Sequence, residues 1–452
     1  MFAFVSIKKG LFPTMRHDLW AISAALLILF LSSCSKDKDE DRFIYEEIEQ
    51  TDDFIGYEPH KSEYCILFYG VGGGNLDAFL LDHIQEGISQ RSSERVQMAM
   101  QFKFSYYLQM IPFHPEWSNT CRLMITGEGD GNGYLKKKLA GEEYDMGTAD
   151  ALASFLQWAM KTCPAEHYIL SLWGHGNGWN PAYDATTKAV LFDDNTLTYL
   201  KIGDIVSGVK ESGMHLDAMI LDSCAMGMAE IYAALSDITD LAVSTPAISS
   251  GGTGNFQTLM QLLESSAPFE EGGLRKALEA YVDKAMKDMK FQTEKCDLSV
   301  TDLRKMDSLM EIAGDLTDAL TKAYKDQEQT INQAVRSTIR MVKDEGFFPL
   351  DLGNLVDNLS MLLPDSPFPS IKERLAAFKK ESFHSARTQA LKDEGLELFL
   401  SVSLMDYSTY YALRYDESYP LLKWDEKTRW SRFLEINSQD TDNNEFLFDE
   451  SH

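Results

Sequence analysis

A histidine and a cysteine, each placed where an apolar run stops, are the residues of this sequence best suited to chemistry. The first run, Tyr168 to Trp173, ends in Gly174-His175-Gly176. The second, Ala218 to Leu221, ends in Asp222, and Cys224 follows two residues later. A thiol with an imidazole base in reach of its sulfur can attack a carbonyl carbon. The pattern therefore predicts a cysteine nucleophile served by a histidine.

A structural role for each residue is the competing interpretation. A histidine between glycines is a common turn residue, and a cysteine after a strand is often a small buried hydrophobe. Either residue alone would favour that interpretation. Here both His175 and Cys224 end strand-like apolar runs, and both are followed by small residues. Their combination favours a shared site.

Strands and helices expected along the chain would bring the two residues together. Further apolar runs of strand length are 63–70, 102–111, 121–126, 241–246 and 297–301, and helical periodicity marks 148–161, 198–212, 226–235, 256–263 and 273–290. Such alternation predicts an α/β fold with a mostly parallel sheet, in which ligands bind beyond the carboxyl ends of the strands. A helix starting at Met226 would also place Cys224 at its positive end and lower the pKa of the thiol.

The two motifs resemble those of a known family. Leu172-Trp-Gly-His-Gly-Asn-Gly-Trp179 and Leu221-Asp-Ser-Cys-Ala-Met226, with Glu230 following, are similar to the His-Gly and Asp-Ala-Cys motifs of the clostripain-like cysteine peptidases. This family shares a clan with caspases, legumains and gingipains. The resemblance extends in order over most of the chain after residue 60 and includes Asn75-Leu76. It implies a caspase-like three-layer α/β/α sandwich with a mostly parallel central sheet and an added C-terminal helical subdomain.

The resemblance also implies an activity, that of a cysteine endopeptidase cutting after Arg or Lys. Cys224 would be the nucleophile and His175 its proton-transfer partner, and the backbone N–H groups of Gly176 and Cys224 would stabilise the oxyanion. Asp222 lies on the same strand face as Cys224 because side chains alternate with period two, so it can bind the basic side chain of the substrate. A strand-end cap or a supporting role is the alternative for Asp222. The loop 249–254, which walls the specificity pocket in the family, has no acidic residue here.

The segment between the two motifs is a candidate processing site. Residues 180–194 are rich in Asp, Thr and Pro, with Lys188-Ala189 near the middle. An exposed loop of this kind is open to cleavage. Members of the family mature by cutting themselves in this region after a basic residue, which implies self-processing at Lys188-Ala189.

The N-terminal residues predict a targeting signal. Lys8, Lys9 and Arg16 precede the apolar run Leu19 to Leu31, which is too short to span a membrane, and Cys34 follows directly after two serines. This pattern resembles a bacterial lipoprotein signal with Cys34 as the lipidated residue, and it implies a cell-envelope protein anchored to the outer membrane.

The domain organisation expected from these features has five parts. They are a signal peptide (1–33), a lipidated polar tether (34–60), a caspase-like catalytic domain (61–301), a C-terminal helical subdomain with a final sheet strand (302–437) and an acidic tail (438–452). Within the fourth part, 302–344 is expected to be a helical hairpin and 395–404 the last strand of the sheet.

Composition and missing motifs exclude several other classes. The formal net charge of −28 argues against nucleic acid as a partner and favours basic peptides. The cysteines other than Cys34 are odd in number and irregular in spacing, so they predict no disulfide framework. The glycines at 70–74 match neither nucleotide-binding fingerprint, and no zinc-protease or serine-hydrolase motif occurs.

No cofactor is expected from the residues themselves. Calcium dependence is possible by family resemblance, but the acidic glycine-rich segment 127–133 lacks EF-hand spacing and no ligand set stands out. We expect a monomer acting on protein or peptide substrates. The alternative is a catalytically silent surface lipoprotein that binds peptides or glycans on a peptidase-like scaffold; the intact pair of His175 and Cys224 argues against it.

Overall fold

A computed structural model describes residues 54, 56–73, 76–105, 117, 120–126, 133–139, 144–179, 190–247, 255–288, 292, 294–340, 349–404, 419 and 422–437. The chain divides into two compact units, Met1–Glu46 and Glu47–His452, and all described residues belong to the second. The predicted signal peptide, Cys34 and the predicted acidic tail therefore lie outside the described residues.

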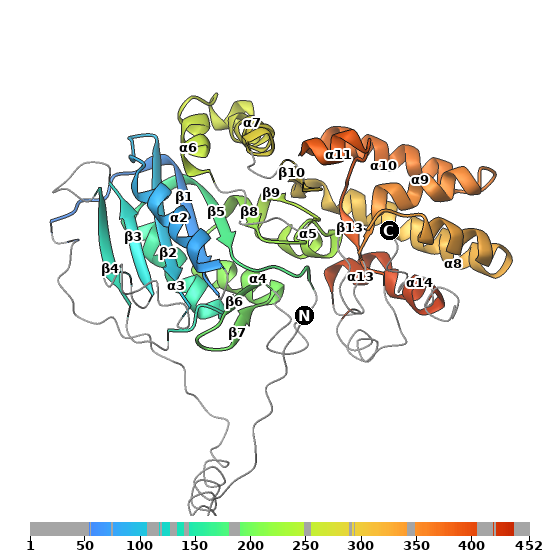
Figure 1. Ribbon diagram of the computed structural model, residues 1–452, viewed down its shortest axis with the longest axis horizontal. Helices are drawn as coiled ribbons and strands as arrows, with labels where there is room; N and C mark the ends of the chain where they lie inside the picture. The colour runs from blue at the N-terminus through green and yellow to red at the C-terminus, as the bar shows by residue number, and fades with distance from the viewer. Residues whose placement is uncertain are drawn as a thin grey trace, which may run out of the picture. The chain divides into compact units, whose positions relative to one another are not determined.

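Within the described residues, nine strands form one sheet in the order β12-β10-β9-β8-β5-β1-β2-β3-β4 (Figure 1). The strands are β1 Ser62–Val71, β2 Val96–Lys103, β3 Cys121–Ile125, β4 Tyr134–Lys138, β5 Ala165–Trp173, β8 Leu216–Asp222, β9 Thr239–Ser244, β10 Asp297–Asp302 and β12 Phe383–Arg387. A separate hairpin pairs β6 (Val190–Asp193) with β7 (Thr198–Leu200), and β11 (Leu350–Asp351) pairs with β13 (Ser401–Val402).

The centre of the sheet is parallel. Strands β2, β1, β5, β8 and β9 run in the same direction, and antiparallel strands extend the sheet at both sides. Strands covered on both faces need apolar residues at every position, as in Tyr64 to Val71, all buried. The mostly parallel sheet predicted from the sequence is confirmed.

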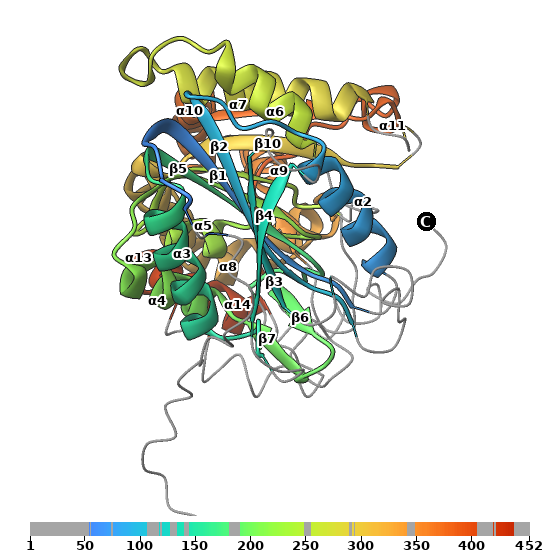
Figure 2. The ribbon, with the colours of Figure 1, turned by 90° about the vertical axis from the view of Figure 1, so that its left-hand side faces the viewer.

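Helices cover both faces of this sheet (Figure 2). On one face lie α2 (Asp77–Ile88), α6 (Phe256–Glu264) and α7 (Gly273–Asp288); on the other lie α3 (Ala149–Thr162), α4 (Ile202–Ser212) and α5 (Ala229–Leu235). Alternation along β1 serves both layers: Phe68 contacts Phe256 of α6, and Tyr69 contacts Phe155 of α3. The expected three-layer α/β/α arrangement is confirmed.

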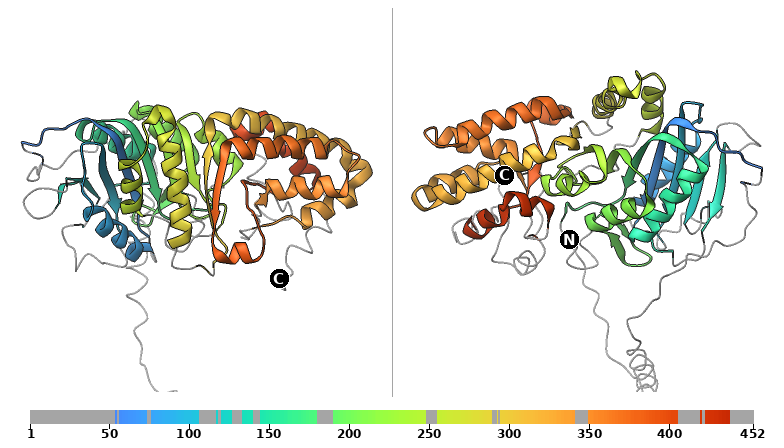
Figure 3. Two further views of the ribbon diagram at one scale, coloured as in Figure 1. Left: turned by 90° about the horizontal axis from the view of Figure 1, so that it is seen from above. Right: turned by 180° about the vertical axis from the view of Figure 1, so that it is seen from behind.

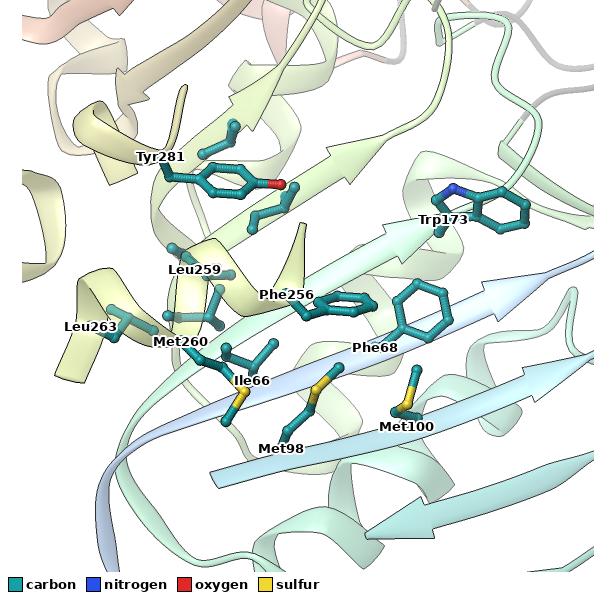
Figure 4. Packing of buried hydrophobic residues seen from close by; sticks show 14 of the residues in the cluster. Ile66, Phe68, Met98, Met100, Trp173, Phe256, Leu259, Met260, Leu263 and Tyr281 are labelled. Carbon is teal, nitrogen blue, oxygen red and sulfur yellow. The ribbon is translucent and has the colours of Figure 1, made fainter. Parts of the chain in front are cut away.

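The core under α6 also fixes the end of β5. Phe256 packs edge-on to Phe68 with ring centroids 5.3 Å apart, and Met98 and Met100 of β2 fill the space beside them (Figure 4). Trp173, the last residue of β5, is 1% exposed within the same cluster. Burying one such side chain contributes about 1.5–3 kcal/mol to the free energy of unfolding. The point at which the chain leaves β5 is therefore held firmly.

The C-terminal helices pack mainly on one another and lie to one side of the central sheet, drawn in orange and red in Figures 1 and 3. They are α8 Met306–Arg336, α9 Leu352–Leu362, α10 Phe368–Ser382, α13 Lys423–Thr428 and α14 Trp430–Asn437, with the short α11 Gln389–Asp393 beside them.

The pair of helices predicted for 302–344 corresponds to α8, in which two helical stretches meet at a kink. The kink lies at Gln327, whose backbone is not helical (φ −130°, ψ 23°). The apolar face continues past this kink, from Leu320 and Tyr324 to Ile331 and Val335, all buried. The hydroxyl of Tyr324 donates to Oδ1 of Asn332 at 2.9 Å, so side chains on the two sides of the kink contact each other.

The last strand of the large sheet is not where the sequence predicts it. It is β12, at the outer edge beside β10, and not the segment 395–404. All side chains of β12 are half-buried, so it lacks an alternating signal. Leu398, Phe399 and Leu400 are apolar because they are buried beneath other elements, and only Ser401–Val402 forms a strand there.

Two predicted elements have different bounds. The strand expected at 102–111 begins earlier, as β2 at Val96–Lys103. The helix expected at 198–212 is shorter, because its first residues form β7 and α4 begins only at Ile202.

Candidate active site

The two motif-bearing strands lie side by side and end level with each other. Strands β5 and β8 are parallel neighbours, and their last paired residues are Trp173 and Asp222. His175 and Cys224 each follow two residues beyond this pair. Both therefore leave the sheet at the same edge, where open parallel sheets bind their ligands.

Gly176 brings the histidine loop into direct contact with the cysteine loop. A Cβ atom on Gly176 would lie 2.5 Å from the carbonyl oxygen of Cys224, 2.7 Å from Cβ of Ser223 and 3.0 Å from the amide nitrogen of Cys224. Real side chains do not tolerate such distances, so only glycine permits this approach. The backbone N–H groups of Gly176 and Cys224 thus belong to one small region of the structure.

Cys224 differs in exposure from the other thiols of the described chain. Cys65, Cys121, Cys163 and Cys296 are buried, whereas Cys224 is half-buried, and none of the five is in a disulfide. His175 is half-buried as well. A nucleophile must be reachable by substrate, and Cys224 satisfies that condition, whereas Nε2 of His175 is buried.

The cysteine loop rests on the chain that follows β9. Ala225 adopts a left-handed conformation (φ 58°), and its N–H donates to the carbonyl of Ala247 at 2.9 Å. The N–H of Gly227 donates to the carbonyl of Thr245 at 2.8 Å. A left-handed non-glycine residue is sparsely populated and persists where surrounding contacts require it, commonly at functional sites.

The prediction that a helix begins at Met226, directly behind the thiol, is wrong. Helix α5 begins at Ala229, and the intervening residues form a turn held by the bonds just described. The first turn of α5 is therefore too far along the chain for the helix-dipole argument, whose effect falls off within one turn.

The histidine loop rests on β6. The carbonyl of His175 accepts a hydrogen bond from the N–H of Leu191 at 3.0 Å. A Cβ on Gly174 would lie 2.8 Å from Cδ2 of Leu191 and 3.1 Å from the carbonyl oxygen of Val71. The position of His175 therefore depends on β6, the strand that begins directly after the predicted processing site.

Strand β6 is anchored by a buried ion pair. Nζ of Lys103 lies 2.8 Å from Oδ2 of Asp193 and donates to the carbonyl of Tyr144 at 2.6 Å. The side chains of Lys103 and Asp193 are 2% and 1% exposed. Sequence reasoning missed this pair because its members are 90 residues apart and neither stands in a recognisable motif.

A buried carboxyl group lies behind the segment that supports Cys224. The hydroxyl of Thr245 donates to Oδ1 of Asp297 at 3.3 Å. Burial, reinforced by the nearby carboxylate of Asp351, raises the pKa of Asp297 to about 7. Nothing in the sequence around Asp297, which opens an apolar strand, indicates this environment.

Several predicted residues lie outside the described part of the chain. They are Lys188 and Ala189, the glycine-rich segment 127–132, Asn75 and the pocket-wall loop 248–254. Asp222 is described: it is the last residue of β8 and is 6% exposed.

The described residues offer neither a metal-binding cluster nor a membrane-spanning helix. They contain no group of three or more His, Cys, Asp or Glu side chains that could hold a metal ion. None of their helices has both the length and the apolar character needed to cross a membrane.

A model of the clostripain family matches residues 75–436. The chain belongs to the clostripain family. The resemblance inferred from its two motifs is thereby confirmed, and the chain is a cysteine peptidase of that family.

Solved structures support the same fold. A secreted C11 cysteine protease from Bacteroides thetaiotaomicron, "iotapain", is 16% identical with a TM-score of 0.57, covering 82% of this chain and 100% of its own. A secreted C11 cysteine protease from the same organism in complex with an irreversible peptide inhibitor is 14% identical with a TM-score of 0.57, covering 82% and 99%. An inactive zymogen C11 protease from Parabacteroides distasonis is 17% identical with a TM-score of 0.57, covering 82% and 99%. No curated protein matches the chain.

Proposed function

We propose that this clostripain-family chain hydrolyses peptide bonds on the carboxyl side of Arg or Lys through a dyad of Cys224 and His175. The observation that carries the proposal is the level ending of β5 and β8, with Gly176 packed against the backbone of Ser223 and Cys224. This contact brings an imidazole-bearing loop and a thiol-bearing loop to one edge of a rigid sheet.

The reaction proceeds through a thioester. Sγ of Cys224 attacks the scissile carbonyl carbon, and His175 gives a proton to the leaving amine. The N–H groups of Gly176 and Cys224 stabilise the negative charge on the carbonyl oxygen, each contributing about 3 kcal/mol. Water then attacks the thioester, with His175 accepting its proton, and the thiol is restored.

Asp222 supplies the preference for basic side chains. Its carboxyl group stands at the end of β8, two residues before the nucleophile, and its side chain is mostly shielded from water. A carboxylate in such surroundings binds a guanidinium or ammonium group more strongly than one in bulk solvent. The net charge of −28 adds a long-range attraction for basic peptides. A C11 protease of similar fold was solved with a peptide inhibitor, which supports a peptide substrate here.

Self-processing at Lys188-Ala189 and lipid attachment at Cys34 complete the proposal. The bond after Lys188 fits the specificity assigned to Asp222, and Val190 starts the strand that supports His175. Attachment at Cys34 would leave the polar tether between the lipid and the catalytic domain, on a protein of the cell envelope. N-terminal sequencing of the active form, which should begin a chain at Ala189, tests the processing step; full activity in an uncut chain refutes it.

A panel of fluorogenic peptides tests the central proposal. Peptides with Arg, Lys, Asp, Asn or Leu before the cleaved bond should show turnover only for Arg and Lys. Cys224→Ala should abolish turnover, whereas Cys65→Ala, which removes a buried thiol from β1, should retain it. Asp222→Ala should lower kcat/KM for basic peptides. Equal turnover of the Leu peptide would remove Asp222 from the pocket, and activity in Cys224→Ala would end the dyad proposal. Binding of peptides or glycans with no turnover would favour the silent-scaffold alternative.

A further inference from the structure

Ser403, in the C-terminal part of the chain, forms hydrogen bonds with three residues that are distant in the sequence or belong to other elements. Its hydroxyl oxygen accepts a hydrogen bond from Nε1 of Trp179 at 2.7 Å, and its amide N–H donates to Oε1 of Glu230 at 2.7 Å. Its carbonyl oxygen accepts from Nε1 of Trp430 at 2.8 Å. Ser403 itself is 0% exposed. One buried residue thus uses its hydroxyl, its amide and its carbonyl on separate partners.

Two of these partners lie a few residues along the chain from the dyad. Trp179 lies four residues after His175, and Glu230 lies six residues after Cys224 in the first turn of α5. The hydroxyl of Tyr419 donates to the same Oε1 of Glu230 at 2.9 Å, and its ring packs edge-on to that of Trp179 with centroids 5.2 Å apart. The contacts therefore close a ring that joins the histidine loop to the cysteine loop.

Backbone contacts tighten the connection on the cysteine side. The N–H of Ser401 donates to the carbonyl of Gly227 at 2.9 Å, and Ser401 forms a bridge with Met228. The short strand β13 thereby runs alongside the turn that follows Cys224. The third partner, Trp430, belongs to α14, and its hydrogen bond to the carbonyl of Ser403 involves neither the histidine loop nor the cysteine loop. Loss of this bond therefore serves as a control for loss of the bond to Trp179.

Because these hydrogen bonds are buried, the loss of one partner is costly. Trp179, Glu230 and Ser403 are 7%, 1% and 0% exposed, so water has little access to replace a lost partner. Oε2 of Glu230 is already buried without a hydrogen bond, and burial raises the pKa of this carboxyl group. Removing the hydroxyl of Ser403 would take away a buried acceptor of the indole N–H of Trp179, a costly change that a loop relieves by moving.

We propose that Ser403 is a positioning residue for the dyad: by binding Trp179 and Glu230 together, it sets the histidine loop and the cysteine loop at a fixed distance. This inference rests on the proposed roles of His175 and Cys224. It assigns to the C-terminal part of the chain a function in catalysis, exerted through the two loops and without contact with the substrate.

Steady-state kinetics on the purified chain test this role with matched variants. Ser403→Ala and Trp179→Phe remove the two ends of one hydrogen bond, and each should lower kcat by about 10- to 100-fold with little change in KM. Trp430→Phe removes the bond to the carbonyl of Ser403 and should leave kcat within about twofold of wild type, whatever its effect on Tm. The double variant Ser403→Ala/Trp179→Phe should be no slower than Ser403→Ala, because both changes break the same contact.

A second measurement needs no peptide substrate. The rate at which iodoacetamide alkylates Cys224, followed against pH, reports how the imidazole influences the thiol. The profile of Ser403→Ala should shift toward that of His175→Ala, and the profile of Trp430→Phe should match wild type. Near-ultraviolet circular dichroism of each variant verifies its folding.

Defined outcomes overturn the proposal. It is wrong if Ser403→Ala, folded as wild type, keeps the wild-type kcat and alkylation profile, or if Trp430→Phe loses as much kcat as Ser403→Ala. It is also wrong if the losses of the two single variants multiply in the double variant. Failure of the dyad proposal would look different: wild type would hydrolyse no peptide, or Cys224→Ala would remain active.

Discussion

A methyl group added at Gly176 should separate the two catalytic loops. In Gly176→Ala the new Cβ would lie 2.5 Å from the carbonyl oxygen of Cys224 and 2.7 Å from Cβ of Ser223. Ordinary contact begins at 3.4 Å, so one loop must retreat by about 0.9 Å. The nearest atom is backbone, which cannot rotate away as a side chain would. Relief therefore requires displacement of His175 relative to Cys224.

The size of the effect follows from that displacement. A misplacement of about 1 Å between reacting groups lowers kcat on the order of a hundredfold. Overpacking of this kind also lowers the free energy of unfolding by about 1–3 kcal/mol. Because the change moves the dyad without removing it, the loss should fall on kcat more than on KM.

Progress curves with an Arg fluorogenic peptide, read together with chemical denaturation, measure both quantities. Gly203→Ala is the matched control, because a Cβ at Gly203 meets nothing within 4 Å in helix α4. It should keep wild-type kcat and alter the free energy of unfolding by less than about 1 kcal/mol. Wild-type kcat in a folded Gly176→Ala variant would refute the packing of the two loops and, with it, the site geometry.

Two buried groups give further predictions. Burial raises the pKa of Asp297 from 3.8 to about 7, so the contribution of its protonated form to stability is complete below pH 3.8 and is lost as the pH increases through 7. The variant Asp297→Asn cannot ionise and escapes this loss. Its free energy of unfolding, measured by urea titration relative to wild type, should therefore grow by about 4 kcal/mol between pH 4 and pH 8. A constant difference across that range would contradict the assigned environment. Lys103→Met leaves the carboxylate of Asp193 buried without its ion-pair partner, so the free energy of unfolding should fall by about 3–5 kcal/mol. Because β6 loosens, kcat should fall as well. The double variant Lys103→Met/Asp193→Asn should recover stability when both variants are compared by thermal melting. If the double variant were as unstable as the single one, the ion pair would not be the cause.

The parts of the fold that the sequence predicts are those with local signals. The apolar runs before His175 and Cys224 have strand length and end in polar residues, and the structure has β5 and β8 at those places, side by side. Thr148 before an amphipathic segment predicts the start of α3, and its hydroxyl accepts from the N–H of Ala151.

Features that depend on distant partners escape such reasoning. The edge strand β12 is half-buried throughout, so its residues show no period. Within the site, the contact of Ser403 with Trp179 spans 224 residues. A serine and a tryptophan so far apart carry no signal until the chain is folded. The neighbourhood of Gly176 and Cys224, in contrast, follows from two short motifs once their strands are adjacent.

Active-site labelling followed by peptide mapping tests the central claim most directly. A peptidyl chloromethyl ketone ending in Arg should alkylate wild type with loss of chloride, and mass spectrometry should locate the resulting thioether adduct on Cys224 alone. The adduct should be absent in Cys224→Ala and should form far more slowly in His175→Ala. An adduct on another cysteine, or labelling of Cys224 at an undiminished rate in His175→Ala, would contradict a dyad built from the ends of β5 and β8.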